Sequence, residues 1–452
     1  MLRLRGIGCM RPVTVPLGQQ GAAPMTQTTK LLDDCFAHDK KRLRHEEALS
    51  ILKQRIAPVV AVEGVALVET AGRILATDIT APHPVPAHTN AAVDGFSFAF
   101  ADYDPKAGRE LSIAGRAAAG HQLTEKPPLG TAARIFTGAV IPDGHDTVVM
   151  QEDVRFGTVN GQQLVGVPPG LKAGANVRKA GEDVKAGEVV LEAGTVLRPQ
   201  DLAALASLGV SRVPCFGRLR VGIVSTGDEI VRVGAQLAPG QVYDANAPML
   251  TALIGTAGAV AVDLGVLPDQ LDEVKRRLAQ AAGQFDVLIT SGGASRGEED
   301  HITAAVEALG KRHLWQLAIK PGRPMSFGQI GNCAVLGLPG NPVAVFVCFL
   351  LYVWPLLRRM GGAPWPEPTR YRLPALFAFK DRKVGRREFW RGMLKETPRG
   401  LGVDKFARDG SGLISGLRAA DGLIDIPEDA QDVQPGDLLT FIPFSEFGIA
   451  GR

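Results

Sequence analysis

The chain has 452 residues, which is more than one ordinary hydrophobic core, so two to four domains are expected. Lys and Arg number 50 and Asp and Glu number 47, a net charge of +3 that gives no support for a nucleic-acid partner. Hydrophobic residues make up 45% and charged residues 21%, which is typical of a soluble globular protein.

The cysteines and the length of the apolar runs indicate in which cellular compartment the protein is located. The five cysteines are odd in number and include no Cys-x-x-Cys pair, which argues for a reducing compartment and against a disulfide frame or a structural zinc site. The longest apolar run, Val343 to Leu357, is short for a membrane span and contains Pro355, so it predicts a buried helix. We therefore expect a cytoplasmic protein with no membrane partner.

The N-terminal part predicts a tail followed by two interleaved domains. Residues 1–30 contain three arginines and no acid, so we expect a disordered tail, with a targeting peptide or a start at Met25 as alternatives. Short strands and Gly/Pro turns predict a small inserted β domain at 82–174. Residues 31–81 and 175–217 are expected to form one discontinuous mixed α/β domain, which includes a helix from Pro199 to Leu208 with Gly209 as its C-cap.

From residue 218 onward, strands alternate with helices, which predicts a mostly parallel sheet in a central α/β domain at 218–362. A β-rich C-terminal domain is expected at 363–452, so the fold class is multidomain α/β plus β. The predicted strands are Leu219–Ser225, Val260–Leu267, Asp286–Thr290, Leu314–Ile319 and Cys333–Leu336, and the predicted helices are Asn246–Ala257, Gln270–Ala282 and Val343–Met360.

Two of these strands end in segments that suit ligand binding. Thr226-Gly-Asp-Glu229 and Ser291-Gly-Gly293 both follow strands, and ligands of such sheets lie at the carboxyl ends of the strands, so the two segments should share one edge. A glycine turn suits an anion, and the carboxylates of Asp228, Glu229 and Asp300 suit Mg²⁺. The alternatives are an N-cap and an ordinary loop with a polar rim.

Two proline-containing loops are further candidates. Lys320-Pro-Gly-Arg-Pro324 holds two cations on a stiff segment, which suits a tetrahedral oxyanion, although a solvated turn is the alternative. Leu338-Pro-Gly-Asn-Pro342 leads into the apolar helix and presents backbone at a helix N-terminus, although turn chemistry alone would explain it. Asp94 precedes a glycine and, judged on its own, is more simply a turn residue.

The motifs occur in one order: VDG, FTGAVIP, MQED, AGEDVKAG, VSTGDEI, YDAN, TSGGASRGEED, KPGRP, GLPGNP. In this order the chain, from about His45 to its end, resembles the MoeA family of molybdopterin molybdenumtransferases and the E domain of gephyrin. The resemblance implies that the α/β domain binds molybdopterin and that the protein is an elongated homodimer with its active site near the dimer interface. It also implies cleavage of adenylylated molybdopterin and insertion of molybdenum from molybdate into the dithiolene, assisted by Mg²⁺.

The resemblance also implies roles for individual residues. The catalytic acids would be Asp94, Asp183, Glu229, Asp269 and Asp300. The substrate-binding residues would be Thr137, Ser291, Gly292, Gly293, Lys320, Arg323, Pro339, Pro342, Arg391 and Ser411, with the oxyanion on Lys320 and Arg323 and with Arg391 and Ser411 nearby. The sequence departs from the family pattern at Ala91, Val93, Arg296, Gln316 and Arg323, of which Gln316 removes a positive charge.

Two other functions stay open beside this one. A molybdopterin adenylyltransferase would resemble only the α/β part, and a non-catalytic scaffold of the gephyrin E-domain type would not need Asp94, Asp300 and Lys320. We expect a homodimer, with molybdopterin adenylyltransferase and apo-molybdoenzymes as possible partners.

Overall fold

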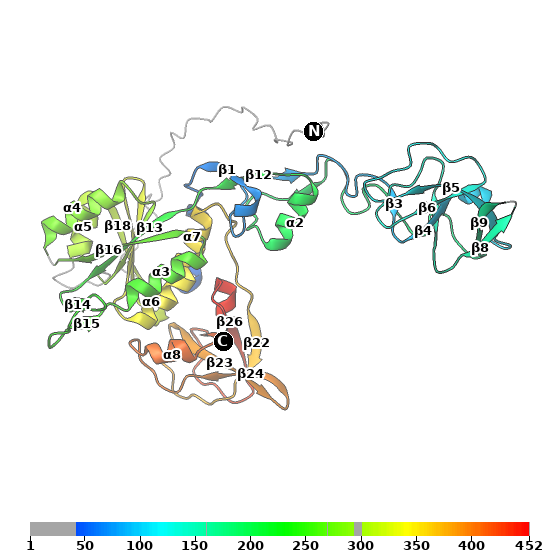
Figure 1. The fold of residues 1–452 in the computed structure, drawn as a ribbon. Coiled ribbons are helices and arrows are strands. Elements are labelled where there is room, and N and C mark those ends of the chain that lie inside the picture. Colours follow the sequence, from blue (N-terminus) through cyan, green and yellow to red (C-terminus); the bar gives the residue numbers. More distant parts are fainter. Residues whose placement is uncertain (1–41, 160, 269, 293–300, 452) are drawn as a thin grey trace. The chain divides into compact units, whose positions relative to one another are not determined.

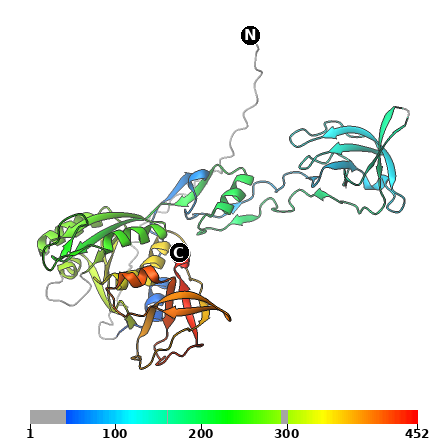
Figure 2. The same ribbon diagram turned by 60° about the horizontal axis from the view of Figure 1, so that its bottom comes forward.

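The computed structural model describes residues 42–159, 161–268, 270–292 and 301–451, and its path is drawn in Figures 1 and 2. The described chain divides into two compact units. Unit 1 contains residues 77–193 and 199–212, and unit 2 contains residues 42–76, 194–198 and 213–451. The tail expected at 1–30 lies outside the described residues, and the domain boundaries given above stay predictions.

Unit 1 is built on a six-stranded mixed sheet with the order β7-β4-β6-β5-β9-β8. Strands β5 and β6 pair in parallel and the other neighbours are antiparallel. Phe96, Phe98, Leu111 and Val165 are buried in its core, as alternation along half-buried strands predicts. The strands are β4 (Gly95–Phe98), β5 (Arg109–Ala117), β6 (Thr131–Ile135), β7 (Thr147–Met150), β8 (Arg155–Val159) and β9 (Gln162–Val167).

Short pairs of strands and one helix complete unit 1. Strand β2 (Ile79–Thr80) pairs with β11 (Val189–Leu191), and β3 (Asn90–Ala91) pairs with β10 (Val177–Arg178). Helix α2 (Pro199–Ser207) is followed by Gly209 at φ +73°, a conformation that suits the glycine expected after a helix.

Unit 2 contains a second six-stranded sheet, of order β16-β13-β17-β21-β20-β18. Strands β16, β13, β17 and β21 are parallel, and β20 and β18 add an antiparallel edge. The expected mostly parallel sheet is confirmed, and the antiparallel edge was not predicted. The strands are β13 (Arg220–Thr226), β16 (Val260–Leu267), β17 (Val287–Ser291), β18 (Lys311–Gln316), β20 (Pro324–Ile330) and β21 (Cys333–Leu338).

Helices cover both faces of this sheet, because its central strands are apolar on both sides. In β17, Val287 and Ile289 pack in the cluster with α3 (Asn246–Thr256) and the Pro342–Met360 helix. Leu288 points into the other cluster, with α4 (Leu271–Ala282) and α5 (His301–Leu309).

The apolar helix consists of α6 (Pro342–Cys348), a π-helical turn (Phe349–Val353) and α7 (Trp354–Met360). By length and composition Pro342–Met360 could cross a membrane, yet 89% of its most apolar window is buried inside the protein. The expectation of a buried core helix is confirmed. The π-helical turn lies directly before the Pro355 region, where a proline removes an α-helical hydrogen bond.

A third six-stranded sheet lies at the C-terminal end of the chain, with the order β19-β23-β25-β26-β22 and β24 beside β23. Its strands are β19 (Ile319–Lys320), β22 (Tyr371–Pro374), β23 (Arg387–Thr397), β24 (Gly400–Lys405), β25 (Gly422–Ile426) and β26 (Leu438–Pro443). The remaining elements of unit 2 are α1 (His45–Arg55), β1 (Val62–Ala66), η2 (Leu67–Glu69), β12 (Arg212–Phe216), β14 (Ile230–Val231), β15 (Val242–Tyr243), α8 (Ile414–Ala419) and η5 (Phe444–Phe447).

The single strand predicted at Leu314–Ile319 is wrong. The structure has β18 in the α/β sheet and β19 in the C-terminal sheet, and it adds β20, which the prediction missed. Between them Leu317 N donates to Arg323 O, and Ala318 N donates to Leu43 O, so the chain leaves the first sheet at this point. The Lys-Pro-Gly-Arg-Pro loop therefore begins in one sheet and ends in the other.

Candidate functional site

The carboxyl ends of three neighbouring strands meet at one edge of the α/β sheet. Ser291 of β17 lies opposite Ser225 of β13 and Leu338 of β21. Thr226 Oγ1 lies 3.4 Å from Ser291 O, and Gly292 N donates to Leu338 O. The prediction that the Thr226 and Ser291 segments share one edge is confirmed.

Asn246 joins this edge to the first turn of α3. Its Nδ2 donates to Ser291 Oγ and to Gly340 O, both at 2.7 Å. The neighbouring Asp244 is buried, accepts Ser225 Oγ at 2.5 Å and caps the backbone N–H groups of Asn246 and Ala247. Neither side chain was predicted as a site residue, although an acid just before a helix is an N-cap signal that the Tyr-Asp-Ala-Asn motif carries.

Two glycines shape the same edge. Gly292 has φ +95°, and a Cβ there would lie 2.6 Å from Thr226 Oγ1, so only glycine fits. Gly227 has φ +125°, and a Cβ there would overlap the Glu229 carboxylate, which lies over the turn. Asp228 and Glu229 are both exposed.

The structure describes only some of the residues that were predicted to bind a metal ion or to act as catalytic acids. Gly293, Asp269 and Asp300 lie outside the described residues. Within the described ranges, no group of three or more His, Cys, Asp or Glu side chains is placed to hold a metal ion. The Asp228, Glu229 and Asp300 metal site therefore stays a prediction.

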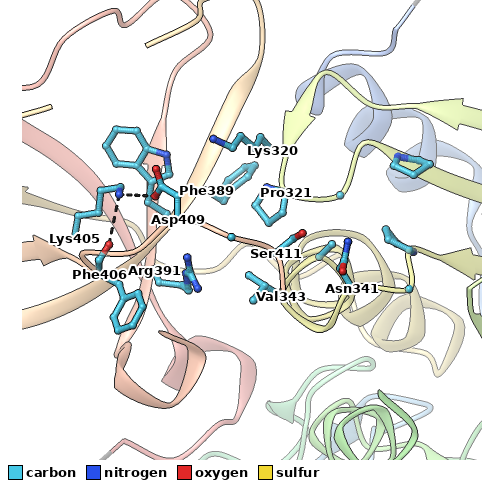
Figure 3. Close-up of a pocket in the computed structure, with 17 residues that line it drawn as sticks. Lys320, Pro321, Asn341, Val343, Phe389, Arg391, Lys405, Phe406, Asp409 and Ser411 are labelled. Atoms are coloured by element: carbon cyan, nitrogen blue, oxygen red, sulfur yellow. Dashed lines mark hydrogen bonds and ion pairs between the residues drawn. The ribbon is translucent and has the colours of Figure 1, made fainter. Parts of the chain in front are cut away.

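A cavity of about 570 Å³ lies between the α/β part and the C-terminal sheet of unit 2, as Figure 3 shows. Its charged lining residues are Lys320, Arg391, Lys405 and Asp409, three cations and one carboxylate with a net charge of +2. Ser411 and Asn341 add polar groups. Phe389, Trp390 and Phe406 form part of its apolar wall. The charge and shape suit an anion larger than a halide.

Arg391 holds the wall of the cavity that contains Ser411. It is 8% exposed, donates to Leu413 O at 3.1 Å and to Arg408 O at 2.8 Å, and stacks 5.1 Å from the Phe406 ring. Burial lowers the pKa of Arg391 from its ordinary value, although guanidinium groups remain protonated in proteins.

Lys405 and Asp409 form an ion pair inside the cavity, with Lys405 Nζ 2.6 Å from Asp409 Oδ1. The ammonium also lies 5.4 Å from the rings of Trp390 and Phe379, which is within cation–π range. Sequence reasoning missed both residues. Lys405 reaches the cavity because β24 pairs with β23, and no local pattern reveals that pairing.

The predicted substrate-binding residues separate into groups. Lys320, Pro339, Arg391 and Ser411 line the one cavity, whereas Ser291 and Gly292 lie at the strand-end edge. Pro342 is the first residue of α6, and the neighbouring Val343 N donates to Ser411 O. Arg323 is exposed and is not among the residues that line the cavity, while Pro324 is.

Unit 1 carries three further predicted residues. Thr137 donates to Asp94 Oδ1 from its backbone N–H at 2.8 Å and from its hydroxyl at 2.7 Å. These two hydrogen bonds lower the pKa of Asp94, and nearby Arg134 adds to the effect. Asp183 is exposed, and its backbone N–H donates to Val85 O.

The fold and the cavity define a multidomain α/β protein with a cationic cavity that suits an anionic ligand. Residues 43–209 match the MoeA N-terminal region (domains I and II), residues 222–359 match a probable molybdopterin-binding domain, and residues 372–444 match the MoeA C-terminal region (domain IV). The second match contains the strand-end edge, and the third contains Arg391, Lys405 and Ser411.

Similar proteins agree with these matches. The chain is 38% identical over 405 residues to a molybdopterin molybdenumtransferase of Haemophilus influenzae, covering 88% of this chain and 98% of that protein. It is 32% identical over 407 residues to molybdopterin molybdenumtransferase 2 of Mycobacterium tuberculosis, covering 87% and 97%. The MoeA crystal structure from Pyrococcus horikoshii superposes with a TM-score of 0.76 at 31% identity, covering 89% and 99%. The chain belongs to the MoeA family of molybdopterin molybdenumtransferases and is an enzyme.

Proposed function

We propose that this enzyme inserts molybdenum into molybdopterin in molybdenum cofactor biosynthesis, with molybdate as the metal source and an adenylylated molybdopterin as the organic substrate. We assign the molybdate site to the cavity between the α/β sheet and the C-terminal sheet because of its charge. Molybdate is a tetrahedral dianion, and the net charge of the cavity lining is +2. Lys320 on β19 and Arg391 on β23 supply cations from neighbouring strands of the C-terminal sheet, and Ser411 supplies a hydroxyl donor.

The strand-end edge is the proposed site of the adenylylated pterin. The turn at Gly292 presents backbone without a Cβ, and Asn246 orders the Ser291 hydroxyl beside it. The Gly292 N–H already donates to Leu338 O, so the Ser291 hydroxyl is the donor that we propose for a phosphate oxygen. Cleavage of a phosphoric anhydride needs charge neutralised on the phosphates rather than a protein nucleophile.

Mg²⁺ is proposed to assist at the same edge. The exposed carboxylates of Asp228 and Glu229 are hard oxygen donors, and Gly227 leaves the space in which the Glu229 carboxylate lies. These residues fit the ion, and Asp300 is the third proposed ligand. When bound, Mg²⁺ would neutralise negative charge that develops on the phosphates.

The proposed catalytic acids are Asp94, Asp183, Glu229, Asp269 and Asp300. Asp94 and Asp183 belong to unit 1. We propose that the enzyme is a cytoplasmic homodimer in which Asp94 serves the site of the opposite subunit. The hydrogen bonds from Thr137 stabilise the ionised form of Asp94 and support a role for it as a carboxylate at neutral pH. A molybdopterin adenylyltransferase and apo-molybdoenzymes are the proposed partners before and after the reaction.

One incubation distinguishes this function from the two alternatives, an adenylyltransferase and a non-catalytic scaffold. The purified chain is mixed with adenylylated molybdopterin, molybdate and Mg²⁺, and the released AMP and the pterin-bound molybdenum are quantified. We expect AMP and bound molybdenum in equal amounts, and loss of both in EDTA or in Glu229→Gln. An adenylyltransferase would instead consume ATP and molybdopterin and release pyrophosphate, and a scaffold would catalyse neither reaction.

A further inference from the structure

Glu388 is a buried carboxylate of the C-terminal sheet whose two oxygens face different ways. The residue is 2% exposed. Its Oε1 accepts Arg386 Nε at 3.0 Å and lies 3.8 Å from an Arg382 guanidinium nitrogen, so this oxygen is anchored in the sheet. Its Oε2 accepts Trp390 Nε1 at 2.9 Å and lies 3.6 Å from Lys320 Nζ.

Both groups held by Oε2 belong to the wall of the cavity, because Lys320 and Trp390 line it. The backbone reinforces this arrangement: Lys320 lies opposite Glu388 in the parallel pairing of β19 with β23. The backbone pairing therefore holds the start of the Lys-Pro-Gly-Arg-Pro loop to the C-terminal sheet, and the Glu388 carboxylate restrains the Lys320 ammonium.

The contact to Lys320 is well suited to a ligand-binding cation. At 3.6 Å it is an ion pair without a close hydrogen bond, and the Lys320 side chain remains 48% exposed. The three donors of the ammonium group are thus free for an incoming anion while its position is restrained. Flexible lysine side chains lose rotamer entropy on binding, so a restrained ammonium binds more tightly than a free one.

We propose that Glu388 is a positioning residue for the oxyanion site, acting through Lys320 on molybdate affinity. This inference rests on the proposed function. The simpler alternative is that Glu388 only balances the buried Arg382 and the half-buried Arg386. Arg382 also donates to the backbone carbonyls of Ala430, Arg386 and Pro427, so its guanidinium is satisfied without Glu388.

The test is a double-mutant cycle read by calorimetric titration of molybdate into the full chain. Glu388→Gln is expected to weaken molybdate binding by about tenfold, because misplacing a binding group by about 1 Å has effects of this order or larger. In this proposal the lost restraint on Lys320 outweighs the repulsion between Glu388 and the anion that the variant also removes. Lys320→Met weakens it by at least as much, and adding Glu388→Gln to Lys320→Met has no further effect. In turnover, Glu388→Gln raises KM for molybdate and leaves kcat within about twofold.

Asp425→Asn is the matched control. Asp425 is also 2% exposed, lies in the same sheet and pairs with Arg370 and Arg387, but it does not line the cavity. It should leave molybdate affinity unchanged. A second variant, Glu388→Asp, keeps the negative charge in the sheet but has a shorter side chain, so its carboxylate lies farther from Lys320. We expect it to bind molybdate about threefold more weakly than wild type.

The results distinguish a failure of the positioning role of Glu388 from a failure of the oxyanion site itself. Three results would overturn the positioning role alone. The first is equal weakening by Glu388→Gln with and without Lys320→Met, and the second is equal weakening by Asp425→Asn. The third is binding by Glu388→Gln that is as tight as in wild type or tighter. Absence of molybdate binding by the wild-type chain overturns the oxyanion site itself.

Discussion

Lys405 Nζ lies 2.6 Å from Asp409 Oδ1 inside the cavity, so the protein places its own carboxylate on one of the three cations that line the cavity. The Lys405 side chain is 11% exposed, whereas that of Asp409 is 56% exposed. An entering oxyanion must therefore compete with an internal anion.

Asp409→Asn removes this competition and should tighten molybdate binding by about three- to tenfold at low ionic strength, because nearby charges at a partly solvated site interact by about 1 kcal/mol or more. Equilibrium dialysis with molybdate at two salt concentrations measures the effect. Asp404→Asn is the control, since Asp404 pairs with Lys395 in the same hairpin and does not line the cavity. Unchanged or weaker binding by Asp409→Asn would rule out the competition.

Gly322, in the Lys-Pro-Gly-Arg-Pro loop, is expected to be intolerant of alanine. It has φ +103°, and a Cβ would overlap Cys348 Sγ of the buried helix. Gly400 has φ +107° with open space around it, so Gly400→Ala reports the backbone strain alone. Gly322→Ala should destabilise the chain by about 1–3 kcal/mol more than Gly400→Ala, the usual range for overpacking.

Chemical denaturation followed by tryptophan fluorescence compares these variants. Adding Cys348→Ala to Gly322→Ala should recover part of the lost stability, because it removes the overlapping sulfur. If the two glycine variants are equally stable, the loop does not pack on the helix as described.

Thr137→Val is predicted to change the pH dependence of AMP release. The hydrogen bonds from Thr137 stabilise the Asp94 carboxylate and lower its pKa, so losing the hydroxyl donor raises that pKa toward its usual value of about 3.9. Asp94 then becomes protonated at a higher pH. The acidic limb of kcat/KM against pH should move to higher pH in Thr137→Val.

Thr131→Val is the control for this profile, because the Thr131 hydroxyl donates to Pro128 O in the same unit and does not contact Asp94. An acidic limb that is identical in wild type and Thr137→Val would show that Asp94 ionisation does not limit the reaction.

The homodimer is tested by mass and by complementation. Light scattering should give about twice 47.9 kDa, and a clean monomer at micromolar concentration would contradict the dimer. Asp94→Asn and Lys320→Met should each be inactive. A mixture of the two, refolded or exchanged together, should recover about one quarter of wild-type activity if one site uses Asp94 and Lys320 from different subunits.

The α/β sheet could be predicted from the sequence because its signals are local. The run around Val287 and Ile289 is apolar on both faces, the glycine turn follows at once, and strands alternate regularly with helices. The buried helix was also predictable, since the run Val343–Leu357 is short for a membrane span and is apolar all round.

The cavity could be predicted only in part, because half of it comes from pairings distant in sequence. Lys320 is a candidate from its loop sequence and Arg391 from the resemblance. Lys405 lines the cavity because β24 pairs with β23, and Glu388 on β23 contacts Lys320 because β19 pairs with the same strand. The two-residue strand β19 is too short to show a period, which is why it was merged with β18 in the prediction.

The oxyanion site is tested most directly by crystals of the chain soaked in molybdate or tungstate, with the metal located by its anomalous scattering. The expected result is a strong peak inside the cavity, within hydrogen-bonding reach of Lys320 Nζ and the Ser411 segment, and its loss in Lys320→Met. A strongest peak at the Gly292 edge, or a cavity without any peak, would contradict the assignment of this cavity to molybdate.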